Sequence, residues 1–296
     1  MPRVFRALAL LCILACQAPP SATGPLVDDA GVPVSLSAPP ARVVSLVPAT
    51  TELVFALGAG GTLVGRTTWC DYPAAAAAVP DLGNGIDPNV EAVVAAKPDL
   101  VLLYKSGANR AAAERFRGLG IPTLELATDR MEDFDRIARV LGAALSRREE
   151  AESLVARTRR DLAAASRPPV LPSSRRPSSR RPSVFILAWD RPAMTLGRGS
   201  FLSEIVDRAG ARNVFDDLAT SSAPVSIEAV AARDPDFILV STEGEPAIAA
   251  RPEWQAVRAV RERRFLRVRG SEFNRPSPRI GSAVRQLAAA LDSLSR

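Results

Sequence analysis

Near its start, the chain has an apolar segment followed by a helical one, which predicts the opening of an α/β unit. Arg42–Val47 is almost continuously apolar, as is typical of a buried strand. The proline that follows ends the strand. A short helix is then predicted from Thr50 or Thr51, either of which can cap its N-terminus, with Gly58 at its C-terminal end. Glu52 falls in the first turn of this predicted helix.

The chain also contains an internal repeat. Residues 226–240 follow the pattern of residues 89–103 position by position: a capped short helix, a Pro-Asp pair that ends it, and a buried apolar strand. A weaker match relates residues 184–187 to residues 43–46. Any helix–proline–strand unit can give one such match, but two matches in the same order favour two similar α/β lobes.

Between the two repeated units, the apolar residues are spaced as in amphipathic helices. This spacing runs through residues 131–145 and 147–165, and neither glycine nor proline interrupts the second segment. We expect a long, stiff connector here. Residues 166–183 contain Ser-Ser-Arg-Arg-Pro twice in tandem, a composition that cannot form a core and predicts a disordered insert. Contact of its arginines with an anionic membrane surface is the alternative interpretation.

The N-terminus has the features of a lipoprotein signal peptide. Two arginines precede the apolar run Ala7–Ala15, which is too short to span a bilayer. The run leads into Cys16 in a sequence that resembles a bacterial lipobox, so we predict lipidation of Cys16. An ordinary cleaved signal with an incidental cysteine is the alternative. The following residues are rich in Pro, Ala, Ser and Gly, which predicts a flexible tether.

Together these patterns predict an α/β fold of two Rossmann-like lobes joined by one long connecting α-helix. The expected segments are a lipoprotein signal peptide at 1–16, a flexible tether at 17–40, an N-terminal lobe at 41–130, connecting helices at 131–165, a disordered insert at 166–183 and a C-terminal lobe at 184–296. The protein is expected to be exported to the periplasm and held at the membrane by a lipid anchor only.

Composition argues against several classes of function. The formal net charge of +6 comes from arginines of the signal segment and the insert, so the rest of the chain lacks the basic footprint of a nucleic-acid binder. The 296 residues include no histidine, the commonest metal ligand and the usual general base at neutral pH. Only Cys70 remains in the mature part, so no intramolecular disulfide can form. Nucleophile-elbow, P-loop and dinucleotide motifs are also missing. We therefore predict neither an enzyme nor a zinc or manganese binder, and no cofactor.

Several short motifs resemble a known family. They are Arg42–Leu46 with Pro48–Leu53, then Cys70–Pro73, Lys97–Val101 and Arg275–Ile280. In this order they resemble the substrate-binding proteins of ABC importers for vitamin B12, haem and iron siderophores, most of all the B12-binding members. The resemblance runs from about Arg42 to the C-terminus, apart from the insert. It implies two α/β lobes on one long helix, a ligand in a shallow cleft between them, and small closing motions.

Two glutamates at equivalent repeat positions gain a role from this resemblance. Glu91 and Glu228 match the pair, one on each lobe, with which family members dock onto arginines of the permease. Charge pairs across such an interface favour register and encounter rate. The alternative is that each glutamate only stabilises the N-terminus of its own helix. The resemblance also implies partners: an ABC permease dimer, its ATPase and a small-molecule ligand, with the binding protein itself a monomer.

Candidate ligand-binding residues follow predicted strands, where α/β folds usually bind ligands. They are Trp69, Gly85, Tyr104, Trp189, Phe273 and Arg275. By the resemblance, Trp69 and Tyr104 match aromatic positions of B12 binders, Gly85 replaces a tryptophan of the cleft, and Trp189 lies near another aromatic position. Aromatic rings suit stacking on a flat, partly apolar macrocycle, and Arg275 suits its amide or acid edge.

We therefore expect a corrinoid, cobalamin-like ligand, with haem and ferric siderophores as alternatives. The missing histidine disfavours axial ligation of a haem iron, although tyrosine can serve. A function of another class also fits: a lipid-anchored protein that senses its ligand without an importer.

Overall fold

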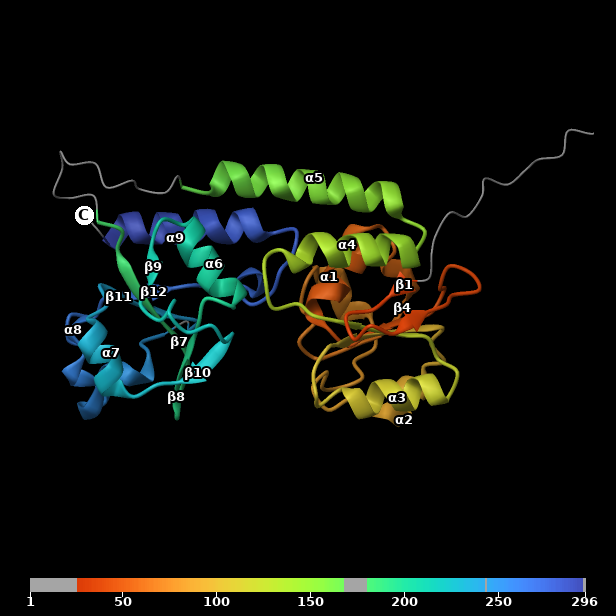
Figure 1. Cartoon of the computed structure of the whole chain (residues 1–296), viewed down its shortest axis with the longest axis horizontal. Helices are drawn as coiled ribbons and strands as arrows, with labels where there is room; N and C mark the ends of the chain where they lie inside the picture. The colour runs from red at the N-terminus through yellow and green to blue at the C-terminus, as the bar shows by residue number, and fades with distance from the viewer. Residues whose placement is uncertain (1–25, 168–179, 243, 295–296) are drawn as a thin grey trace, which may run out of the picture.

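The computed structural model describes residues 26–167, 180–242 and 244–294, and it places two α/β lobes next to each other beneath one long helix (Figure 1). This helix, α5 (Arg148–Ala165), packs against α4 (Asp133–Ala144) of the N-terminal lobe and α9 (Ile280–Leu294) of the C-terminal lobe. The predicted fold class, two α/β lobes joined by a long helix, is confirmed.

The N-terminal lobe is built on a parallel sheet. Its strands, in the spatial order β4-β3-β5-β6, are β3 (Val43–Ser45), β4 (Leu63–Arg66), β5 (Leu100–Tyr104) and β6 (Thr123–Leu126). Its helices besides α4 are α1 (Pro48–Ala56), α2 (Val90–Ala95) and α3 (Arg110–Gly118). Leu100 and Leu102 pack with α1 and α4 on one face, and Val101 and Leu103 pack with α2 and α3 on the other. Burial on both faces explains the unbroken apolar sequence of β5.

The C-terminal lobe repeats this plan with an antiparallel extension. Its strands are β7 (Ser183–Asp190), β8 (Ala193–Leu196), β9 (Arg212–Asn213), β10 (Ser222–Pro224), β11 (Phe237–Val240) and β12 (Phe265–Arg267). The order is β10-β8-β7-β11-β12, with β9 beside β7. The β10–β8 and β8–β7 pairs are antiparallel, and the other pairs are parallel. Its helices besides α9 are α6 (Phe201–Arg208), α7 (Ile227–Arg233) and α8 (Arg258–Arg261).

The internal repeat corresponds to matching elements in the two lobes. The Asn89 side chain accepts a hydrogen bond from the Ala92 amide at the start of α2, and the Ser226 side chain accepts one from the Ala229 amide at the start of α7. Each helix is followed by a buried parallel strand, β5 or β11. Short 3₁₀ helices lie in the loops: η1 (Gly60–Thr62), η2 (Ala74–Ala78), η3 (Ala247–Ala250), η4 (Pro252–Ala256) and η5 (Ser271–Phe273).

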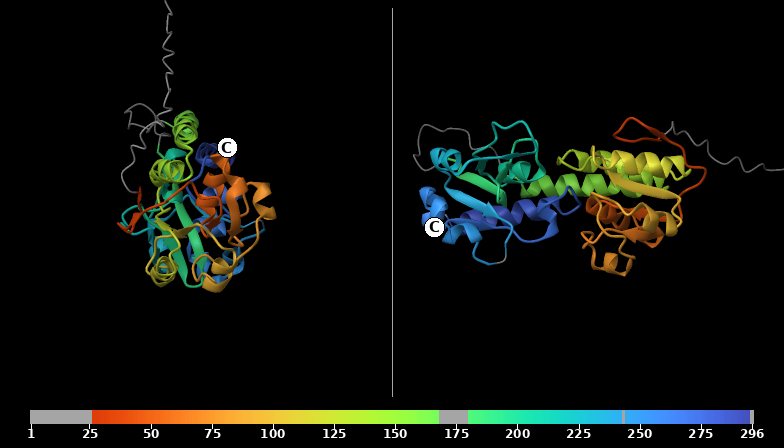
Figure 2. Two further views of the ribbon diagram at one scale, coloured as in Figure 1. Left: turned by 90° about the vertical axis from the view of Figure 1, so that its right-hand side faces the viewer. Right: turned by 90° about the horizontal axis from the view of Figure 1, so that it is seen from below.

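The connector is shorter than the predicted segment 131–165. Helix α4 belongs to the N-terminal lobe, because Phe134, Ile137 and Leu141 are buried in its core, so α5 alone links the lobes. Helix α9 runs beside α5 (Figures 1 and 2). At their contact a Cβ on Gly281 would lie 2.9 Å from the Asp161 backbone, so only glycine allows this approach. One hydrophobic cluster includes residues of both sheets and of α4, α5 and α9, which makes the joint stiff.

The predicted flexible tether is wrong for the part that the structure describes. Strands β1 (Leu26–Val27) and β2 (Pro33–Val34) form a hairpin on the N-terminal lobe. Its turn residue Asp28 is 4% exposed and accepts a hydrogen bond of 2.6 Å from Arg117, which also binds Glu125. The neighbouring Asp29 pairs with Arg136. Residues 1–25, with Cys16, lie outside the described residues.

The predicted disordered insert is ordered at both described flanks. Arg167 pairs with Asp292, and Arg181 pairs with Asp207. Arg180 pairs with Asp236, and β7 already begins at Ser183. Residues 168–179 lie outside the described part. Within the described ranges, none of the helices has the length and apolar character that crossing a membrane requires.

We predict that Asp28→Ala lowers the free energy of unfolding by about 2–3 kcal/mol, because the substitution removes one of the two carboxylates that pair with Arg117 and the acceptor of the Ala30 and Val32 amides. Urea unfolding followed by circular dichroism measures this loss. Glu152→Gln, which removes an exposed partner of Arg139, serves as the control and should change the stability very little. Equal effects of the two substitutions would contradict a structural role for Asp28.

Candidate functional site

The contacts between the lobes come from segments that follow strands of each lobe. On the N-terminal side, the cross-lobe contacts come from segments that follow β3, β4 and β6. On the C-terminal side they come from segments that follow β8 and β12. The Phe201 amide donates to the Asp129 carbonyl at 2.7 Å, and Arg130 pairs with Glu204. Because ligands of α/β folds bind beyond the carboxyl ends of strands, the candidate site lies at this interface.

Two tryptophans are exposed near these strand ends. Trp69, three residues after β4, is 69% exposed, and Trp189, near the end of β7, is 63% exposed. The indole N–H of Trp189 donates to the Arg191 carbonyl at 2.9 Å. Trp254 differs from both because it is 1% exposed within the core of the C-terminal lobe. The sequence interpretation placed Trp189 after its strand, whereas it lies inside β7.

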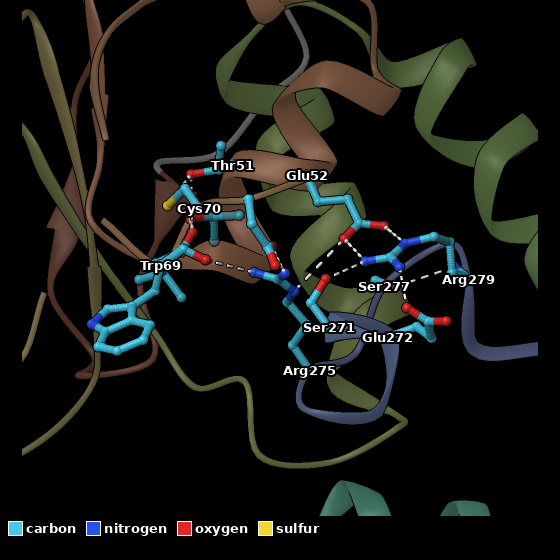
Figure 3. A network of polar contacts seen from close by, with 12 residues as sticks. Thr51, Glu52, Trp69, Cys70, Ser271, Glu272, Arg275, Ser277 and Arg279 are labelled. Carbon is cyan, nitrogen blue, oxygen red and sulfur yellow. Dashed lines mark hydrogen bonds and ion pairs between the residues drawn. The ribbon is translucent and has the colours of Figure 1, made fainter. Parts of the chain in front are cut away.

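A buried carboxylate of α1 joins the two lobes. Glu52 is 2% exposed, and its Oε1 and Oε2 accept hydrogen bonds of 2.8 and 2.9 Å from Nε and Nη2 of Arg279 (Figure 3). Nε of Arg275 lies 3.8 Å from the same carboxylate. Both arginines belong to the segment between η5 and α9. The bidentate pair is the strongest geometry that a guanidinium and a carboxylate can adopt.

Each arginine makes further contacts. Arg275 pairs with Asp71 and donates to the Trp69 carbonyl at 3.4 Å, and Arg279 pairs with Glu272 and donates to Ser271 at 3.0 Å. We call the group Glu52, Asp71, Glu272, Arg275 and Arg279 the cross-lobe cluster. The guanidinium carbon of Arg279 also lies 3.8 Å from the ring centroid of Tyr72, a cation–π contact.

The charges of the cross-lobe cluster stabilise one another. Burial alone would raise the pKa of Asp71, but the hydrogen bond and the positive charge of Arg275 outweigh this and hold the pKa below its ordinary value. Burial alone would lower the pKa of Arg279, but its hydrogen bond to Glu52 and the charges of Glu52 and Glu272 raise it. Both groups are therefore held in their charged forms.

Two of the predicted ligand-binding residues are buried in this structure. Phe273 is 2% exposed and packs in the central core, so its ring cannot meet a ligand. Arg275 is 6% exposed, and its guanidinium binds Asp71, the Trp69 carbonyl and Glu52. It is therefore a bridge between the lobes and is not free for the edge of a ligand.

Gly85 and Tyr104 have structural partners. A Cβ on Gly85 would lie 2.2 Å from the Leu46 carbonyl oxygen, so the loop can approach the end of β3 only with glycine. The next residue, Ile86, is 68% exposed and was not among the predicted ligand-binding residues.

The Tyr104 hydroxyl donates a hydrogen bond of 2.6 Å to Asp129. The pKa of Tyr104 is raised, first because the side chain is partly buried and second because of this hydrogen bond. A phenolate at Tyr104 is therefore strongly disfavoured.

The predicted docking glutamates lie far from the connecting helix. Glu91 and Glu228 are the second residues of α2 and α7, and both are exposed with no ion pair among the described residues. Helices α2 and α7 lie on the side of the two lobes remote from α5 (Figure 1). The two carboxylates thus share one side of the molecule, at equivalent places on the two lobes.

A cavity of about 670 Å³ lies beside α5, with walls from both lobes. None of the six predicted ligand-binding residues lines it. Its walls carry six arginines and five carboxylates, several paired with each other, as in Arg130–Glu204 and Arg159–Asp135. Such walls do not suit a flat apolar ligand.

Among the described residues, no three side chains of Cys, Asp or Glu are grouped so that they could hold a metal ion.

Comparisons with known proteins agree on the kind of protein. The family model described as "Periplasmic binding protein" matches residues 43–271. The vitamin B12-binding protein of Salmonella typhimurium is 30% identical over 264 residues, which is 89% of this chain and 94% of the relative. The uncharacterized ABC transporter substrate-binding lipoprotein YvrC of Bacillus subtilis is 30% identical over 274 residues, covering 90% and 84%.

A solved structure supports the same conclusion. The periplasmic haem-binding protein from Pseudomonas aeruginosa superimposes with a TM-score of 0.70 at 27% sequence identity, covering 85% of this chain and 92% of that chain. The two-lobed architecture therefore matches a structure of known class over most of its length.

We predict that the stabilising effect of Asp71 is lost in acid. Because pairing with Arg275 lowers the pKa of Asp71 in the folded protein, its contribution is present above its ordinary pKa and disappears as the pH falls through the lowered value. Asp71→Asn should therefore be less stable than the wild type at pH 7. The difference should shrink below about pH 4. Urea unfolding of both proteins at a series of pH values checks this, and a difference independent of pH would contradict the pairing.

Proposed function

Because this chain belongs to the periplasmic binding protein family, we propose that it binds a corrinoid, cobalamin-like ligand outside the cytoplasm, as a monomer, and delivers it to an ABC importer. The observation that carries the proposal is the exposure of one tryptophan on each lobe, Trp69 and Trp189, near the strand ends. Large aromatic side chains this exposed are favoured where a ligand or partner will cover them.

The chemistry of the site favours a ligand whose metal needs no axial ligand from the protein. A haem iron needs an axial ligand such as histidine or tyrosinate, and the chain has no histidine. Of the two tyrosines, Tyr104 holds its proton in a hydrogen bond to Asp129, and the ring of Tyr72 lies against the guanidinium of Arg279. A corrinoid offers a broad apolar ring face for stacking and amide edges for hydrogen bonds, and the B12-binding relatives support it. Haem is the second candidate, supported by the P. aeruginosa structure.

Delivery to an importer is supported by the placement of Glu91 and Glu228. Each is exposed at the start of a short helix on the side remote from α5. One partner surface with two basic groups can therefore pair with both lobes at once, which fixes register. The ATPase joins this complex through the permease. The B. subtilis relative, a substrate-binding lipoprotein, supports both this role and a lipid anchor at Cys16.

We predict that Trp69→Ala and Trp189→Ala each weaken cobinamide binding about tenfold or more, because each removes one stacking surface. Isothermal titration calorimetry with cobinamide, cobalamin, haemin and a ferric hydroxamate measures the effect. Leu119→Ala removes another exposed apolar side chain, at the end of α3, and should bind like the wild type. Unchanged affinity in both tryptophan variants would contradict the site, and binding of haemin alone would identify the second candidate.

We also predict that Glu91→Gln with Glu228→Gln lowers ligand uptake about tenfold or more while ligand affinity stays unchanged, because the partner loses both charge pairs. Uptake of labelled ligand by cells that carry the importer is the readout. Glu149→Gln, an exposed carboxylate in the first turn of α5, is the matched control. Normal uptake by the double variant would contradict docking through these residues.

A further inference from the structure

We propose that Glu52 is a positioning residue for ligand binding, which acts through Arg275 to fix the loop that presents Trp69. This inference rests on the proposed function only in taking Trp69 as a ligand contact. It assigns a role in ligand binding to a buried carboxylate of the N-terminal lobe, whose arginine partners belong to the C-terminal lobe. The role was not expected from the sequence, which predicts only that Glu52 lies in the first turn of a helix.

Few contacts of its own side chain fix the position of Trp69. The residue is 69% exposed, and its indole points away from the arginines of the cross-lobe cluster (Figure 3). The backbone of its loop must therefore determine where the ring stands. The Trp69 carbonyl accepts hydrogen bonds from Arg275 at 3.4 Å and from the Asp71 amide at 3.1 Å.

The rest of this loop is held from both lobes. Cys70 is buried and accepts a hydrogen bond of 3.1 Å from Thr51, the neighbour of Glu52 on α1. Asp71 pairs with Arg275, and the Tyr72 ring lies beneath the guanidinium of Arg279. Three of the four residues from Trp69 to Tyr72 thus contact arginines of the C-terminal lobe.

Glu52 determines the orientation of these arginines. It accepts hydrogen bonds from Nε and Nη2 of Arg279, and its carboxylate lies 3.8 Å from Nε of Arg275. This Nε is buried and has no hydrogen-bond partner among the residues that the structure describes, so Glu52 at 3.8 Å supplies its electrostatic compensation. The other carboxylate on Arg275, Asp71, is 59% exposed. Without the negative charge of Glu52, Arg275 loses its buried anchor and keeps only the exposed one.

A second glutamate at the lobe interface serves as a control. It distinguishes a role in positioning the Trp69 loop from a role in holding the two lobes together. Glu204 of α6 bridges the lobes through Arg130 at 3.1 Å and the Met131 amide at 2.7 Å. No residue of the Trp69 loop takes part in that bridge. A substitution at Glu204 therefore weakens the lobe contact in a similar way and leaves the loop contacts intact.

The test uses the protein labelled with 5-fluorotryptophan, whose three fluorine resonances are assigned with Trp→Phe variants. Without any ligand, Glu52→Gln should shift or broaden the Trp69 resonance and leave those of Trp189 and Trp254 unchanged, and Glu204→Gln should change none of them. Cobinamide affinity should fall about tenfold in Glu52→Gln and stay within twofold in Glu204→Gln, because only the first loses preorganisation of the loop.

A Trp69 resonance identical to the wild type in folded Glu52→Gln would overturn the inference, and so would equal changes in Glu204→Gln. Arg275→Lys is the second variant if Glu52→Gln does not fold, since lysine keeps the charge but cannot reach Glu52, Asp71 and the Trp69 carbonyl together. If the wild type binds no cobinamide but the Trp69 resonance responds as expected, the proposed ligand is wrong and the positioning role of Glu52 stands.

Discussion

The interaction on which this architecture most depends is the buried pairing of Glu52 with Arg279. A carboxylate that is 2% exposed is tolerated only when donors surround it, and these come from the other lobe. The pairing therefore fixes how α1 meets the segment before α9. Together with the hydrophobic cluster shared by α4, α5 and α9, it leaves the lobes little freedom, which fits a binding protein with small closing motions.

The fold was predictable to the extent that its signals are local. The period of the connecting helix, the apolar strand β5 and the caps at Asn89 and Ser226 are each visible within a short segment. The N-terminal hairpin was missed because the burial of Asp28 depends on Arg117, 89 residues away. The start of α1 was also misplaced. The helix begins at Pro48, so Glu52 falls outside its first turn.

The candidate site was predictable where it depends on single exposed side chains. Trp69 and Trp189 were proposed as ligand contacts because aromatic residues near strand ends are recognisable from the sequence alone, and both are exposed in the structure. The burial of Arg275 was not foreseen because the freedom of an arginine depends on its partners, and Asp71 is 204 residues away from it. Glu52 and Arg279, separated by 227 residues, were missed for the same reason. No periodicity or short motif encodes such pairings.

The two halves of the cross-lobe cluster differ in their exposure to dissolved ions. The side chains of Glu52 and Arg279 are 2% and 19% exposed, whereas that of Asp71 is 59% exposed. Ionic strength screens exposed charge pairs within a Debye length of about 8–10 Å and affects buried pairs far less. Salt in the surroundings therefore weakens the hold of Arg275 on the Trp69 loop before it weakens the joint between the lobes.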